Sequence, residues 1–221
     1  LVMYLVTTTP GFIIESRPRG ESGKVFSIFT RDLGLIMVSA QGIRLEKSKL
    51  RFHSQEYSFG EFSFVRGKEY WRLTNANQLR DESRKSQETN WDGRNAIRAT
   101  GKQKNEKAKN SSELKEIIGR IVLLLRRLLH GEEAHPELFD HIEKSFAFIE
   151  SSEDLSDIRL KTTESVIVFR ILHLLGYIGA DKKLNPKITA DNLGVQLLDE
   201  VGSQRMNINA HINKALKESH L

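Results

Sequence analysis

The first third of the chain is rich in residue types that bind phosphate groups and flat rings. Arginine and lysine side chains pair with phosphates, and exposed aromatic rings stack on nucleobases. Four of the cations fall within the eight residues 44–51, in an apparent loop. The candidate binding residues are Arg17, Arg19, Arg31, Arg44, Lys47, Lys49, Arg51, Arg66, Lys68 and Trp71.

Structural roles account for some of these residue types and not for others. Phe62 and Phe64 are expected to fill the protein interior. Tyr70 and Trp71 are adjacent and must face opposite sides of a strand, so one is expected in the core and the other at the surface. A solvated loop needs no such density of one charge, so residues 44–51 favour binding of a polyanion.

Residue patterns typical of catalysis and metal binding are missing from the sequence. The glycines near Lys24 do not form a phosphate loop, because Pro18 and Val25 replace the glycine and the Ser or Thr that such a loop requires. The histidines within residues 130–141 lack the spacing of a helical zinc site. There is no cysteine for a thiolate metal site and no Gly-x-Ser-x-Gly sequence. We therefore expect a non-enzymatic protein without a metal or another cofactor.

The cations and aromatic rings lie on or next to segments that are predicted to be strands. Short apolar runs rich in Phe, Val and Ile recur about every ten residues, with turn sequences at 31–34 and 66–68 between them. Five strands in about 75 residues favour a closed barrel of the oligonucleotide-binding type, the OB-fold. The predicted strands lie in residues 11–14, 25–29, 35–38, 59–65 and 70–73.

The second half of the chain has the 3.6-residue period of helices. Its apolar residues follow the i, i+3, i+4 pattern from Ser112, the expected N-cap, toward His130. The stretch 155–177 is apolar on nearly all sides, which predicts a central buried helix. The fold class is therefore α+β, an OB barrel followed by an all-helical domain. The other expected helices begin at Pro136 and cover about 191–201 and 206–219.

Charge and composition divide the chain into three parts. Residues 1–80 carry a net charge of +5, 81–115 carry +3, and 116–221 carry −3. Residues 81–111 contain little to bury, which predicts a basic flexible linker or insertion. We expect an OB domain at 1–80 and a helical domain at 112–221. No apolar stretch is long enough for a membrane span, and no secretory signal is read, so a cytoplasmic location is expected.

Several ordered sequence segments resemble the bacterial RecO family, a DNA repair and recombination mediator. In the first half these are 9–21, 29–35, 40–44, 47–51 and 73–76; in the second they are 135–139 and 169–177, which ends in Leu-Gly-Tyr. The resemblance implies binding of single- and double-stranded DNA, annealing of complementary strands, and cooperation with RecR and the single-strand-binding protein in the cytoplasm, at the nucleoid. Many relatives carry a four-cysteine zinc ribbon after the Leu-Gly-Tyr. This chain has none there, so zinc is not expected.

Two other classes of function remain open from the sequence. The barrel is also compatible with an OB-fold RNA-binding or translation-associated module, and with a protein-interaction adaptor whose positive charge is incidental. Arg126 and Arg127 lie off the apolar stripe of their helix and are candidates for binding the acidic tail of the single-strand-binding protein. An ordinary role as solvated arginines is an equal alternative for them.

Overall fold

The computed structural model describes residues 5–46, 48, 50, 54–78, 103–152, 156–179, 184–190 and 193–219, with only the backbone for 78 and 103–111. The chain divides into two compact units. The first contains the strands together with Leu129–Pro136, and the second contains the helices.

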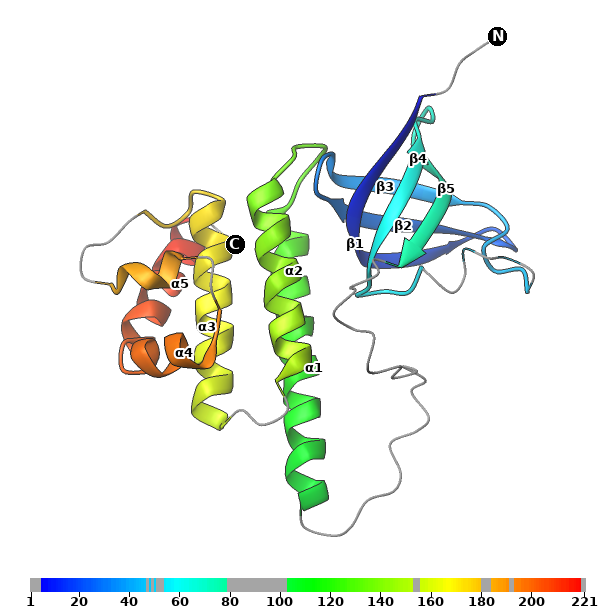
Figure 1. Cartoon of the computed structure of the whole chain (residues 1–221). Coiled ribbons are helices and arrows are strands. Elements are labelled where there is room, and N and C mark those ends of the chain that lie inside the picture. Colours follow the sequence, from blue (N-terminus) through cyan, green and yellow to red (C-terminus); the bar gives the residue numbers. More distant parts are fainter. Residues whose placement is uncertain are drawn as a thin grey trace. The chain divides into compact units, whose positions relative to one another are not determined.

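The first unit is a closed barrel of five strands (Figure 1). Around the barrel the strands follow the order β1-β2-β3-β5-β4, and β4 pairs again with β1. This topology confirms the predicted OB-type barrel. The strands are β1 Val6–Arg19, β2 Gly23–Thr30, β3 Gly34–Ala40, β4 Phe59–Val65 and β5 Trp71–Gln78.

Strand β1 closes the barrel because it is long and bent. Its first half pairs with β4 and its second half with β2, both antiparallel. The register shifts between Ile13 and Glu15, a β-bulge that places both Ile13 and Ile14 in the interior. Between β3 and β5 the strands are parallel, with Val38 opposite Trp71. That pairing brings the start of β5 beside the end of β3.

The barrel interior is filled by side chains that alternate along the strands. Phe26, Phe62 and Phe64 are fully buried there, which confirms the structural role expected for the latter two. Trp71 is half-buried, packs against this core, and meets Phe64 edge-on at 6.4 Å between ring centroids. Tyr70 lies just before β5 and is half-buried as well, so the expected division between these two rings is only partial.

The second unit consists of helices arranged around α3 (Figure 1). Helix α3 packs against α1, α4 and α5, which confirms the predicted central helix. Its buried hydroxyls donate to backbone carbonyls four residues earlier, as Thr162 does to Ile158 at 2.8 Å, so these hydroxyl groups are satisfied. The elements are α1 Gln103–Leu128, α2 Pro136–Ser151, α3 Asp157–Leu174, a 3-10 turn Pro186–Thr189, α4 Val195–Gly202 and α5 Arg205–Glu218.

The start of α1 corrects the sequence prediction. The helix begins at Gln103 rather than at Ser112, inside the segment assigned to the linker. Residues 103–109 consist of Gln, Lys, Asn, Glu and Ala, and most of these are good helix formers. A charged segment without apolar residues is therefore compatible with a helical extension as well as with a linker. Among the helices that the structure describes, none is both long and apolar enough to cross a membrane.

Candidate nucleic-acid interface

A groove of about 900 Å³ runs along one end of the barrel. Three segments far apart in the sequence line it: 19–24 at the β1–β2 turn, 39–41 at the end of β3, and 66–70 with Arg72 at the β4–β5 connection. In OB-folds, the loops between strands 1 and 2 and between strands 4 and 5 border the surface that binds oligonucleotides. The groove therefore lies where this fold binds nucleic acids.

The β4–β5 connection is tightly folded at Gly67. A Cβ atom added there would overlap the carbonyl oxygen of Tyr70, so only glycine allows this close approach. On the other side of the groove, the loop after β3 lies against the β1–β2 turn, because the Arg44 backbone N–H donates to the Ser22 carbonyl at 2.9 Å. Backbone contacts thus shape the loops around the groove.

Positive charge dominates the lining of the groove. Five cations line it, against two carboxylates, those of Glu21 and Glu69. Of these cations Lys24 is half-buried and the rest are exposed to solvent. Such a concentration of one charge along a concave surface attracts polyanions. The cations are Arg19, Lys24, Arg66, Lys68 and Arg72.

Two aromatic rings lie beneath arginines at this groove. The guanidinium carbon of Arg19 is 4.6 Å from the centroid of the Tyr70 ring. That of Arg66 is 4.9 Å from the centroid of Trp71. Cation–π contacts of this kind orient each guanidinium and leave its N–H groups directed along the ring plane. Each pair combines a hydrogen-bond donor for phosphate with a flat apolar surface.

Glu132, in the segment Leu129–Pro136, binds the second of these pairs. Its carboxylate accepts hydrogen bonds from Arg66 Nη1 and, at 3.1 Å, from Trp71 Nε1. The hydrogen bond from Arg66 lowers the pKa of Glu132 below that of an ordinary glutamate. An acidic side chain from the α1–α2 connection is therefore part of this end of the barrel.

The connection itself is held to the barrel through its backbone. The Leu35 N–H donates to the Gly131 carbonyl at 3.0 Å. Gly34 has a φ of +73°, and a Cβ atom at this position would overlap the backbone of Glu133. The segment is thus anchored at the start of β3 without the Glu132 side chain.

The structure brings some of the predicted residues together and separates others. Arg19, Arg66 and Lys68 line the groove, and Trp71 lies beside them. Arg44 is adjacent, with Nη1 3.4 Å from the carbonyl of Gly20. Lys47, Lys49 and Arg51 fall outside the described residues.

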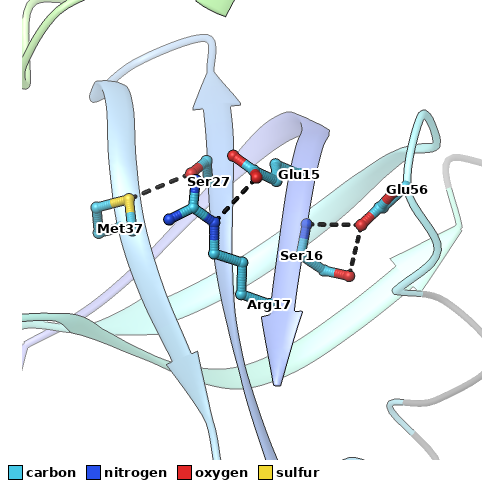
Figure 2. Close-up of polar contacts among 6 residues, drawn as sticks. All are labelled: Glu15, Ser16, Arg17, Ser27, Met37 and Glu56. Carbon is cyan, nitrogen blue, oxygen red and sulfur yellow. Dashed lines mark hydrogen bonds and ion pairs between the residues drawn. The ribbon is translucent and has the colours of Figure 1, made fainter. Parts of the chain in front are cut away.

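Arg17 and Arg31 occupy other positions on the barrel. Figure 2 shows the Arg17 side chain turned back toward Glu15, with Nε 2.9 Å from Oε1. The same outer face of the sheet carries Ser27 and Met37, which are hydrogen-bonded across β2 and β3 (Figure 2). Arg31 lies in the turn at the opposite end of β2 from the groove and is 3.8 Å from Asp32. Neither arginine lines the groove.

Other groove residues were absent from the predicted set. Lys24, Arg72 and Tyr70 line the groove, and Glu132 contacts it from another part of the chain. The hairpin register could have indicated Lys24, since a lysine next to the β1–β2 turn lies near Arg19. No local pattern marks Glu132, because its position depends on how the α1–α2 connection meets the barrel.

In the second unit, the two arginines assigned to partner binding are exposed in the last turn of α1. Leu123, one turn earlier, is also exposed, so an apolar side chain accompanies Arg126 and Arg127. Arg120 of the same helix forms a two-bond ion pair with Glu164 of α3, at 2.5 and 2.9 Å.

A smaller cavity of about 310 Å³ lies between α2, α3 and the 3-10 turn. Two of its polar side chains are hydrogen-bonded within the unit: Arg170 Nε donates to the Ile188 carbonyl at 2.5 Å, and His173 Nδ1 is 2.8 Å from the Ile178 carbonyl. His173 is thus hydrogen-bonded to the backbone of its own unit. Within the described residues, no three His, Asp or Glu side chains converge as metal ligands.

Comparison with known proteins agrees with the barrel fold. Residues 3–80 match the sequence model of the family described as the N-terminal domain of recombination protein O. The barrel resembles RecO. A DNA repair protein RecO from Dehalococcoides mccartyi is 38% identical over 60 residues, which are 27% of this chain and 24% of that protein. The RecO of Rubrobacter xylanophilus is 33% identical over 70 residues, 32% of this chain and 28% of that protein.

A RecO from Desulfitobacterium hafniense is 36% identical over 56 residues, covering 25% of this chain and 20% of the relative. The matches therefore span about a quarter of each curated RecO protein. The RecO-like part of this chain is the unit that carries the groove.

Proposed function

We propose that the protein is a non-enzymatic DNA repair and recombination mediator that binds single- and double-stranded DNA in the barrel groove. The observation that carries this proposal is the placement of five cations and two arginine-capped rings between the β1–β2 and β4–β5 loops. Cations along a groove pair with phosphates, and rings accept unstacked bases. The RecO-like sequence of the same unit supports DNA as the nucleic acid.

Annealing of complementary strands follows from the same chemistry. Two DNA strands repel each other through their phosphates, and a basic surface that neutralises both allows them to meet. Base stacking on protein rings is reversible, so a held strand remains able to pair with its complement. We expect annealing to proceed without ATP or metal.

The partner proteins are RecR and the single-strand-binding protein. For the latter, the exposed surface of Leu123, Arg126 and Arg127 is the proposed docking site, since it offers two cations and an apolar side chain to an acidic tail. Both arginines also lie at the C-terminal end of α1, where cations stabilise a helix. Titration of the full chain with the tail peptide, before and after the Arg126→Glu, Arg127→Glu change, separates these roles. Unchanged peptide affinity in a destabilised double variant would remove both arginines from the docking site.

The central experiment measures the affinity of the full chain for single-stranded DNA, double-stranded DNA and RNA of equal length over a series of salt concentrations. The proposal predicts binding that prefers DNA to RNA and weakens steeply with salt. Replacing Arg19, Lys68 and Arg72 with Glu is expected to abolish it. The matched control replaces three exposed lysines of α3 and α5, Lys161, Lys214 and Lys217, with Glu.

Three outcomes would decide against the proposal. An equal loss of DNA affinity in the two triple variants would mean that the net charge of the protein, rather than the groove, drives binding. A preference for RNA would favour an RNA-binding or translation-associated module. Absence of nucleic-acid binding at every salt concentration would indicate a protein-interaction adaptor.

A further inference from the structure

Glu132 occupies the donors that a phosphate group would use at one end of the groove. Its carboxylate accepts from the Arg66 guanidinium and from the indole N–H of Trp71. A guanidinium binds carboxylates and phosphates through the same N–H groups and in the same planar geometry. Arg66 also lines the groove. An internal anion and a nucleic-acid phosphate therefore compete for one cation.

The contact is weak enough to be displaced. The Arg66 side chain is 60% exposed and that of Glu132 is 46% exposed, so water screens both partners. Ion pairs of this exposure contribute little to stability. A polyanion held by four further groove cations can therefore replace the carboxylate at a small cost.

Release of the carboxylate does not require the α1–α2 connection to leave the barrel. The Leu35–Gly131 backbone hydrogen bond and the close approach at Gly34 hold the segment independently of the Glu132 side chain. A rotation of the glutamate side chain alone uncovers Arg66 and the indole N–H. The competitor stays tethered beside the site, and it returns when the ligand leaves.

We propose that Glu132 is a built-in competitor for phosphate, which sets the affinity and the salt dependence of nucleic-acid binding at the Arg66–Trp71 end of the groove. This inference rests on the proposed function of the groove. Binding in the presence of Glu132 exchanges one anion for another at Arg66. That exchange releases fewer counterions than binding to an unoccupied arginine.

The test compares Glu132→Gln with Glu133→Gln in the full chain. Both variants lose one negative charge from the same segment, and only Glu132 contacts the Arg66–Trp71 pair. The probe is a dye-labelled deoxythymidine oligonucleotide, and its dissociation constant is measured over a range of salt concentrations. Thermal unfolding of each variant confirms that it is folded.

Glu132→Gln is expected to bind about two- to fivefold more tightly than the wild type at low salt. Its log–log salt dependence is expected to be steeper by about 0.7. Glu133→Gln is expected to show a smaller change in both. Glu132→Asp, which keeps the charge and shortens the side chain, is expected to bind more tightly as well. In an Arg66→Gln background, the Glu132→Gln change is expected to have no greater effect than the Glu133→Gln change.

Equal effects of Glu132→Gln and Glu133→Gln would overturn the inference, since only long-range charge would then matter. Weaker binding by Glu132→Gln would also overturn it, because Glu132 would then orient Arg66 for binding. In both cases the proposed function survives if the Arg19, Lys68, Arg72 triple variant has lost binding. If that triple variant binds as the wild type does, the proposed function itself fails.

Discussion

Arg19 and Tyr70 meet at the groove, with the guanidinium carbon of Arg19 4.6 Å from the centre of the Tyr70 ring. Arg19 is the last residue of β1, and Tyr70 immediately precedes β5. Their contact links the two loops that border the groove. It orders a cation and a ring together, at the place where a phosphate and its base would bind.

Replacing Tyr70 with Leu is expected to weaken binding of single-stranded DNA. Stacking of a base on an aromatic side chain is worth about 1–3 kcal/mol, and Leu offers no flat face. Double-stranded DNA should lose less, because its bases are already stacked. Anisotropy titrations with both DNA forms provide the measurement, with Tyr177→Leu, an exposed tyrosine of the helical unit, as the control. An equal loss for both DNA forms would argue against stacking at Tyr70.

Gly67→Ala is expected to lower both the thermal unfolding midpoint and the DNA affinity. The new methyl group would overlap the Tyr70 carbonyl, so the β4–β5 connection would have to move, and overpacking of this kind typically costs about 1–3 kcal/mol. Gly179→Ala is the control, because a Cβ atom there meets nothing within 4 Å. Two variants with the same unfolding midpoint and affinity would show that the connection adapts without strain.

Reversing the charge of the basic loop is expected to abolish DNA binding. The variant changes Arg44, Lys47, Lys49 and Arg51 to Glu. Arg44 begins this loop beside the β1–β2 turn that lines the groove. The unfolding midpoint should change little, because solvated charges add little to stability. Single reversals should each flatten the log–log salt dependence on single strands by about 0.7 per lost phosphate contact. A folded quadruple variant with wild-type binding would exclude the loop from the interface.

The stability of the Arg66–Glu132 contact is expected to depend on pH in the acidic range. The folded-state pKa of Glu132 lies below its unfolded value, because Arg66 and then Trp71 donate to the charged carboxylate. The contribution of this contact to the free energy of unfolding is therefore complete above the unfolded pKa of about 4.3. It is lost as the pH falls through the lower folded-state pKa. The unfolding midpoints of the wild type and Glu132→Gln, measured from neutral to acidic pH, should converge on acidification. A constant difference would show that the carboxylate charge does not contribute.

Gly119→Ala is expected to stabilise the protein by about 0.5–1 kcal/mol, since Gly119 is an interior residue of α1 and glycine costs about that much relative to alanine. A Cβ atom at this position meets nothing within 4 Å. Gly42→Ala provides the contrast, because Gly42 has a φ of +69°, where alanine is strained. Denaturant unfolding of the two variants should shift in opposite directions. Destabilisation by Gly119→Ala would mean that this glycine has a packing role.

The sequence determined the elements of this protein because they depend on local periodicity. A short apolar run predicted a strand at 35–38, which lies within β3 Gly34–Ala40, and the burial expected for Phe62 and Phe64 is confirmed. The helical period identified α2, and the nearly all-apolar stretch identified α3 as the central helix. The predicted start of α1 was wrong. A charged segment without an apolar stripe can form either a helix or a linker, and the two differ little in composition.

Only the tertiary structure decided which charges share a site. Arg17 and Arg19 are two residues apart on β1, yet Arg17 binds Glu15 on the outer face while Arg19 reaches Tyr70 at the groove. Closure of the barrel sets this difference, because the β3–β5 pairing brings the start of β5, with Tyr70 just before it, beside the end of β3. Glu132 shows the same limit most clearly. Its role depends on a backbone contact between the α1–α2 connection and the start of β3, and long-range contacts of that kind leave no periodic trace in the residues that make them.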